Sequence, residues 1–245
     1  MSNTTKNCNR AKRRSPFTVF RRDETGSVAV EGIFSTLLLF GWLLASFQIY
    51  EAFSIRADAT RSTYMIADML SRQRSTVGPK YVNGLQKVFN FLTNAKADNQ
   101  TWLRVTLYKC KAEDDDPPNA YCDGVNKKFT LIEDSDNNPA SYATPGANDA
   151  TLAQPYTQAG LNAISDRLPV MAVGDMAVIT ETIYRFKPFI NISDISLINT
   201  KTDSSGNKTV TGTLVHKQGL YTGLPFATFV VTRPREPKLV WNEDS

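Results

Sequence analysis

The chain has 245 residues, and 28 Lys and Arg against 24 Asp and Glu give it a formal net charge of +4. Residues 1–26 hold seven basic and two acidic residues, a net of +5, so residues 27–245 carry a net of −1. Because the basic excess belongs to the first tenth of the chain, we expect no nucleic-acid partner. The single histidine, His216, excludes a multi-histidine metal site. The common phosphate-binding, metalloprotease and serine-hydrolase motifs are also missing, so we expect no enzyme, no cofactor and no metal site.

An apolar run of 23 residues, from Val28 to Tyr50, follows the basic segment. A helix of this length crosses about 30 Å of hydrocarbon, the thickness of a lipid bilayer core. Basic residues precede the run and no comparable cluster follows it, so the positive-inside rule predicts a cytoplasmic leader, residues 1–26. We expect a single-pass protein of the inner (cytoplasmic) membrane with a periplasmic C-terminal domain. The alternative is a cleaved signal peptide, but the sequence around Ala45 (LLASF) lacks its small-x-small cleavage site.

Glu31 lies inside this apolar run. A carboxylate held at the centre of a bilayer costs up to about 3 kcal/mol, so an acid at such a position indicates a function and a partner. The alternative is a side chain that reaches the membrane interface without a specific role.

The segment Arg21–Glu31 (RRDETGSVAVE) resembles the leader of a type IV prepilin, in which a basic leader ends in glycine and a glutamate is the fifth residue after the cut. The resemblance implies cleavage between Gly26 and Ser27 by a prepilin peptidase. It also implies an assembly role for Glu31, which would neutralise the new amine of a neighbouring subunit's Ser27 inside the apolar filament core.

The helical pattern continues beyond Tyr50 without glycine or proline until Gly78. Apolar residues recur on one face in this part, whereas charged residues occupy the remaining positions. We therefore expect one helix from Ser27 to about Arg74, apolar all round in residues 27–50 and amphipathic in residues 51–76.

Residues 77–245 are expected to form an α+β head. Amphipathic spacing predicts a second helix at Val77–Ala95 and a short third helix at Ala159–Leu168. Residues 134–157 are rich in turn-forming residues and predict a long loop. Alternating or β-rich segments predict strands at Thr101–Cys110, Lys127–Glu133, Ala177–Phe186, Lys208–Lys217 and Phe226–Thr232. This order predicts an antiparallel sheet covered by helices, with an extended tail after the last strand.

Three segments of the chain resemble TadE/TadG-like proteins of the Tad (Flp) tight-adherence pilus system: residues 66–73 (IADMLSRQ), 169–189 and 231–241. The resemblance implies a pilin-like fold and, as partners, other Tad/Flp pilins, a prepilin peptidase and the inner-membrane pilus assembly platform. Gly32 stands where the very short major pilins tend to have tyrosine. Residues 203–207 (DSSGN) do not match the metal motif of the von Willebrand A-like domain in some TadG-type members. Both features favour a TadE-like minor pilin, or pseudopilin.

Three cysteines are present, of which Cys8 lies in the leader and two lie in the exported part. Disulfides persist outside the cytoplasm, so we expect a Cys110–Cys122 bridge; two unpaired thiols are the alternative. The acidic run at residues 113–116, inside the loop that the bridge closes, is expected to be solvated, with calcium binding as the alternative. Residues 134–138 begin like an EF-hand loop but are followed by proline where that loop needs glycine, so we reject a calcium site there.

Together these features predict a minor pilin that acts in Tad (Flp) pilus assembly and cell adhesion after insertion in the membrane and cleavage behind Gly26. The main alternative is an uncleaved single-pass envelope protein whose periplasmic domain binds a ligand or a surface. A periplasmic hydrolase is a third possibility that no motif supports.

Overall fold

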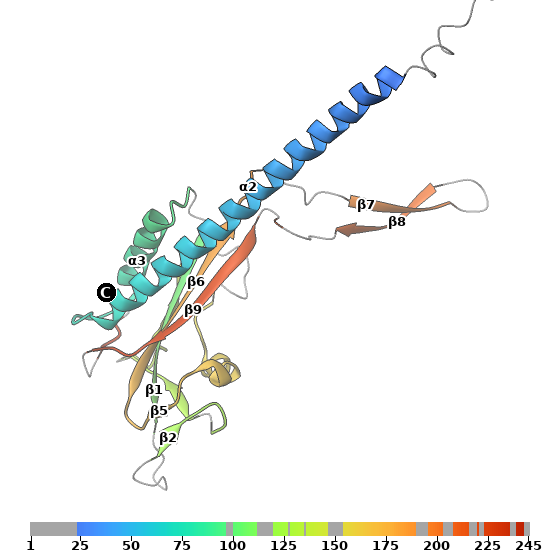
Figure 1. Ribbon diagram of the computed structural model, residues 1–245. Helices are drawn as coiled ribbons and strands as arrows, with labels where there is room; N and C mark the ends of the chain where they lie inside the picture. Colours follow the sequence, from blue (N-terminus) through green and yellow to red (C-terminus); the bar gives the residue numbers. More distant parts are fainter. Residues whose placement is uncertain are drawn as a thin grey trace, which may run out of the picture. The chain divides into compact units, whose positions relative to one another are not determined.

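A computed structural model of the protein is shown in Figure 1. It describes residues 24–96, 100–111, 120–126, 128–134, 136–146, 154–189, 196–202, 208–215, 220, 223–235 and 239–242. Cys8, His216, the acidic run at 113–116 and residues 203–207 lie outside these ranges. By their internal contacts the residues fall into two units, Met1–Phe47 and Gln48–Ser245.

Helix α2 (Glu24–Ser71) runs without a break through 48 residues. It confirms the long helix expected from the sequence, but it begins and ends three residues earlier than expected. In its apolar part the hydroxyls of Thr36 and Ser46 donate to the carbonyls of Gly32 and Trp42, four residues back. These polar groups are therefore satisfied within the helix, as a segment in a hydrocarbon environment requires.

The second unit contains an antiparallel sheet in the order β3-β1-β6-β9. Strand β1 (Thr101–Cys110) pairs along nearly its whole length with β6 (Met176–Phe186), which in turn pairs with β9 (Leu224–Thr232). The other edge of β1 is shared by two short strands, β3 (Phe129–Leu131) and β4 (Ser141–Ala143). The structure thus confirms the expected α+β layout of a long N-terminal helix followed by an antiparallel sheet.

The remaining elements are short or pair only locally. Strands β2 (Tyr121–Cys122) and β5 (Met171–Ala172) form one small ribbon, and β7 (Ser196–Thr202) and β8 (Lys208–Val215) form a separate hairpin. The helices of this unit besides α2 are α3 (Pro79–Leu92), α4 (Gln158–Ala163) and the 3₁₀ helix η1 (Ser165–Arg167).

Two expectations for the region between β1 and α4 are wrong. Residues 134–157 are more than a loop, because β4 pairs with β1 there and the Ser141 hydroxyl lies 2.7 Å from that of Thr106. The strand expected at Lys127–Glu133 is limited to the three residues of β3. It ends because the chain turns back after it, with an isolated bridge between Glu133 and Pro139. The strands β2, β5 and β7 were not expected at all.

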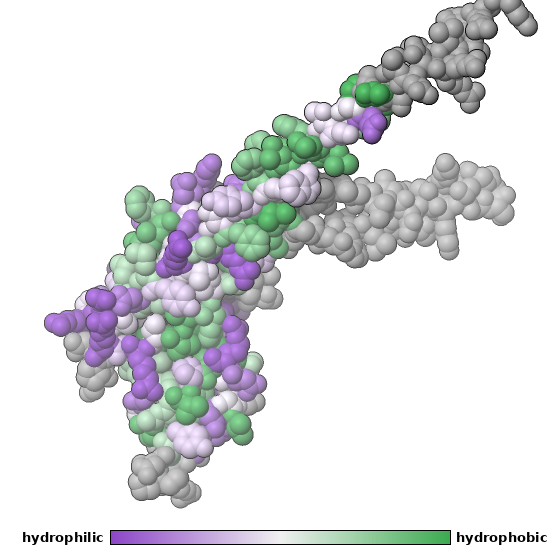
Figure 2. All heavy atoms as spheres, viewed as in Figure 1, coloured by the Kyte–Doolittle hydropathy of each residue, from purple (hydrophilic) through white to green (hydrophobic). Residues whose placement is uncertain are grey.

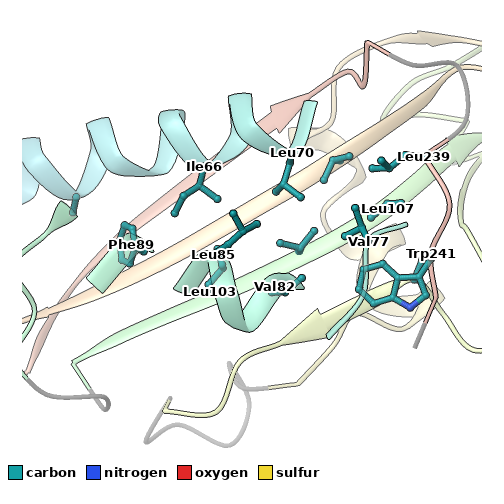
Figure 3. Packing of buried hydrophobic residues seen from close by; sticks show 14 of the residues in the cluster. Ile66, Leu70, Val77, Val82, Leu85, Phe89, Leu103, Leu107, Leu239 and Trp241 are labelled. Atoms are coloured by element: carbon teal, nitrogen blue, oxygen red, sulfur yellow. The ribbon is translucent and has the colours of Figure 1, made fainter. Parts of the chain in front are cut away.

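Two apolar clusters cover the two faces of the sheet. On one face, side chains from α2, α3 and β1 point toward one another (Figure 3), and Ile66, Leu85 and Leu103 are each at most 3% exposed. The other face packs beneath α4 and η1, where Tyr108 and Leu161 are fully buried. Alternation along β1 sends successive side chains to opposite faces, so this strand contributes to both clusters.

The C-terminal tail returns to the start of α3. Val77 donates its backbone N–H to the carbonyl of Val240 at 2.9 Å and accepts from Asn242 at 3.0 Å, in a parallel bridge with Trp241. Leu239 and Trp241 are each 3% exposed and belong to the same cluster as α2 and α3 (Figure 3). The extended tail expected from the sequence is therefore an integral part of the core.

Candidate functional site

Large apolar side chains are exposed on all sides of the N-terminal part of α2. Val28, Leu38 and Trp42 are 71%, 74% and 72% exposed, and hydrophobic residues gather along this segment in Figure 2. In the described part of the chain, α2 is the one helix long and apolar enough to span a membrane. Such a surface is unfavourable in water, so lipid or other apolar chains must cover it.

The residues of the expected processing site lie at the beginning of α2. Gly26 and Ser27 are its third and fourth residues, and Glu31 follows one helical turn after Ser27 with an exposed side chain. The first four backbone N–H groups of a helix have no partner within it, and glycine is about 1 kcal/mol less favourable than alanine in a helix. The peptide bond after Gly26 therefore lies in the first turn of α2, which unwinds at a lower cost than the middle of the helix.

Glu31 and Ser27 share one side of the helix, because residues four apart lie above one another. The rise between them is about 6 Å, so the carboxylate stands close to the end that a cut after Gly26 would create. The structure places Gly26, Ser27 and Glu31 on one helix.

The expected disulfide is present, joining Cys110 at the end of β1 to Cys122 in β2 with a Cα–Cα distance of 5.6 Å. Cys122 is fully buried, and the turn after it packs on η1. Gly124 is needed in this turn because a Cβ there would lie 2.9 Å from the Cα of Asp166. The bridge therefore fixes the β2–β5 ribbon to the end of the sheet.

Within the second unit, the ribbon and Glu51 of α2 belong to opposite ends of the sheet. Tyr184 has a raised pKa, because of burial first and the nearby Glu51 carboxylate second, so Glu51 lies near the end of β1 that starts at Thr101. Cys110 ends the same strand about 30 Å away, at the strand rise of about 3.3 Å per residue. The disulfide-bonded ribbon is thus remote from Glu51.

A buried ion pair that the sequence reasoning missed joins the two longest strands. Arg104 of β1 and Glu181 of β6 face each other in the register, with Nε and Nη2 of the arginine 2.6 and 2.5 Å from Oε2 of the glutamate. Their side chains are only 9% and 13% exposed. The sequence signal for this ion pair is a basic residue in β1 and an acidic residue in β6, two strands that are rich in apolar residues.

Other groups around this ion pair satisfy its remaining atoms. The Arg104 guanidinium donates to the carbonyl of Gln154 at 2.9 Å and lies 3.7 Å from the ring centroid of Tyr156 and 5.0 Å from that of Trp102. The hydroxyl of Tyr156 donates to Oε1 of Glu181 at 3.0 Å. Burial and the Glu181 carboxylate raise the pKa of Tyr156 to about 12. With each charge compensated by its partners, the cluster ties β1 to β6 at this position of the register.

Asp134, at the start of the segment that we reject as an EF-hand, orders its own turn. Its Oδ1 accepts backbone N–H bonds from Asp136 at 2.9 Å and Asn138 at 2.8 Å. These hydrogen bonds, that from Asn138 first, lower the pKa of its carboxyl. Across the residues that the structure describes, no group of three or more His, Cys, Asp or Glu side chains is placed to hold a metal ion.

Comparisons with known proteins add no identity to this picture. No family model matches the chain, and neither a curated protein nor a solved structure matches it significantly.

Proposed function

We propose that the protein is a TadE-like minor pilin, or pseudopilin, that acts in the assembly of a Tad (Flp) pilus and in adherence. In this proposal the N-terminal part of α2 holds the precursor in the inner membrane, and a prepilin peptidase cuts after Gly26. The observation that carries the proposal is the continuity of α2, which has an uncovered apolar surface from Val28 to Leu43 and then contributes Ile66 and Leu70 to the core of the head. A helix of this kind can replace its contacts with lipid by contacts with neighbouring helices while it carries a folded domain.

The position of Glu31 supports a role in subunit contacts. After cleavage Ser27 would carry a positive amine, and a neighbouring subunit's Glu31 would neutralise it. In a surrounding of low dielectric constant an unpaired charge is costly, so this pairing would select one axial position for each subunit.

The disulfide supports a periplasmic head. A bridge such as Cys110–Cys122 persists in an oxidising compartment and is rare in the cytoplasm. The basic residues of the segment 1–26 support the complementary cytoplasmic location of the leader.

Co-expression with a type IV prepilin peptidase tests the processing step, with intact mass as the readout. We expect the wild-type chain to lose residues 1–26, and Gly26→Ala to retain them. Gly32→Ala is the matched control, because a Cβ at Gly32 would have nothing within 4 Å. Cleavage of the Gly26→Ala chain at the wild-type rate, or an intact leader in all three chains, would contradict the proposal and favour the uncleaved envelope protein.

Association with other pilins tests the assembly step. We expect Glu31→Gln to insert and be processed normally but to lose most of its co-purification with other pilins from detergent-solubilised membranes. Glu51→Gln is the control, because it removes the same charge from an exposed position later on α2. Equal co-purification of both variants would show that Glu31 has no part in subunit contacts.

A further inference from the structure

The head has an open pocket of about 640 Å³ beside β3 and the end of β1. Three lysines, Lys109, Lys111 and Lys128, contribute to its lining together with Glu133 and Asn137. A volume of this size is within the range of sites that bind small ligands, roughly 300–1,000 Å³. Lys109 and Lys111 flank Cys110 in the chain, so the pocket belongs to the disulfide end of β1.

Polar side chains that are fully engaged with the backbone form the framework of the pocket. The amide of Gln158 donates to the carbonyl of Phe129 at 2.7 Å and accepts from the N–H of Leu131 at 3.0 Å, so it occupies the outer edge of β3. Asn126 binds the backbone of its own turn in a similar way, donating to the carbonyl of Tyr121 at 2.6 Å. These bonds hold the walls in place before any ligand arrives, which lowers the entropic cost of binding.

Other lining groups remain available for a ligand. The side chains of Lys109, Lys111, Glu133 and Asn137 are exposed, and none of them has a hydrogen bond or ion pair with another residue that the structure describes. The pocket therefore presents ammonium groups beside the amide of Asn137 and two carboxylates, those of Glu133 and Asp134, of which Asp134 is engaged with the backbone of its own turn. Ammonium groups bind anions, whereas carboxylate and amide oxygens accept hydrogen bonds from hydroxyls.

We infer that this pocket binds an anionic oligosaccharide, whose carboxylate or phosphate groups pair with Lys109 and Lys111 and whose hydroxyls bind Glu133 and Asn137. A nucleic acid is a poorer fit, because Phe129, the aromatic residue of the lining, is fully buried and offers no ring on which a base could stack. The inference goes beyond the proposed function and does not rest on cleavage after Gly26.

Isothermal titration calorimetry of the full chain in detergent micelles tests the inference. The probes are hexagalacturonate, phosphorylated maltohexaose and neutral maltohexaose. We expect at least one anionic probe to bind and the neutral one to bind at least about tenfold more weakly, because the neutral probe cannot form charge-assisted hydrogen bonds with the lysines. Which anionic probe binds more tightly distinguishes a carboxylated from a phosphorylated ligand.

Two double variants with the same loss of charge locate the site. Lys109→Gln/Lys111→Gln is expected to weaken binding of the anionic probe about tenfold or more. Lys87→Gln/Lys96→Gln, at exposed positions in and after α3, is expected to leave it within about twofold. Absence of binding, equal binding of neutral and anionic probes, or equal losses in both double variants would overturn the inference. Cleavage of the leader is measured in a separate experiment. An uncleaved leader would therefore contradict the proposed function without affecting the interpretation of the binding data.

Discussion

Replacement of Glu181 by methionine is the sharpest perturbation of the head. The change removes both contacts of Oε2 with Arg104, at 2.5 and 2.6 Å, and the 3.0 Å bond from Tyr156 to Oε1. Arg104 then holds an uncompensated charge with its side chain 9% exposed. Loss of one partner of a buried ion pair costs about 3–5 kcal/mol. We expect about 3 kcal/mol, because Arg104 keeps its bond to Gln154 and the contacts with two aromatic rings.

The assay is denaturant unfolding of the full chain in micelles, followed by near-UV circular dichroism to report the packing of the head. A double-mutant cycle with Arg104→Met separates the pairwise interaction from the loss of packing. The double variant is expected to be more stable than Glu181→Met alone, because no isolated charge remains buried. Glu133→Met, at an exposed acid, serves as the control and should stay within about 0.5 kcal/mol of the wild type.

Two results would refute this reasoning. One is a loss below about 1 kcal/mol for Glu181→Met, the value typical of an exposed ion pair. The other is an additive cycle, in which the double variant loses the sum of the two single losses.

Three further predictions concern the stability of the head. Cys110→Ser/Cys122→Ser should lower the free energy of unfolding by about 3 kcal/mol in the chain-entropy model, and reductant should destabilise the wild type but not this variant. The native pKa of Tyr156, about 12, is above the ordinary value of 10, so its stabilisation is complete below about pH 10 and decreases as the pH rises toward 12. Tyr156→Phe should therefore flatten the alkaline decline in the unfolding midpoint, and an unchanged slope would contradict this. Trp241→Ala should cost about 3–5 kcal/mol and speed hydrogen exchange at the Val77 amide; a loss below 1 kcal/mol would mean that the tail contributes little to the core.

The long elements of this fold are predictable because their patterns are local. The apolar run and the spacing of Ile66 and Leu70 predict α2, and the β-rich alternation of Thr101–Cys110 predicts β1 with the bounds that the structure has. Strand β6 extends the expected segment by one residue at its start. In these segments the intrinsic preference and the packing agree.

The parts that could not be predicted depend on distant partners. Strand β4 has three residues, Ser-Tyr-Ala, of which only the tyrosine favours a strand, and it exists because β1 offers an unpaired edge beside Thr106. The Arg104–Glu181 pair needs the register of β1 against β6, which no single segment specifies. The hairpin β7–β8 is different, because its pattern is local: the turn-rich residues 203–207 separate two β-rich segments, and this order predicts a hairpin.

The most direct measurement of the central claim is the N-terminal sequence and intact mass of the chain recovered from the membranes of its own cells. The account predicts a mature chain that begins at Ser27 and has lost the seven basic residues of the leader, so that its side chains carry a formal net charge of −1. A chain that retains residues 1–26 at steady state, in cells with an active prepilin peptidase, would contradict it.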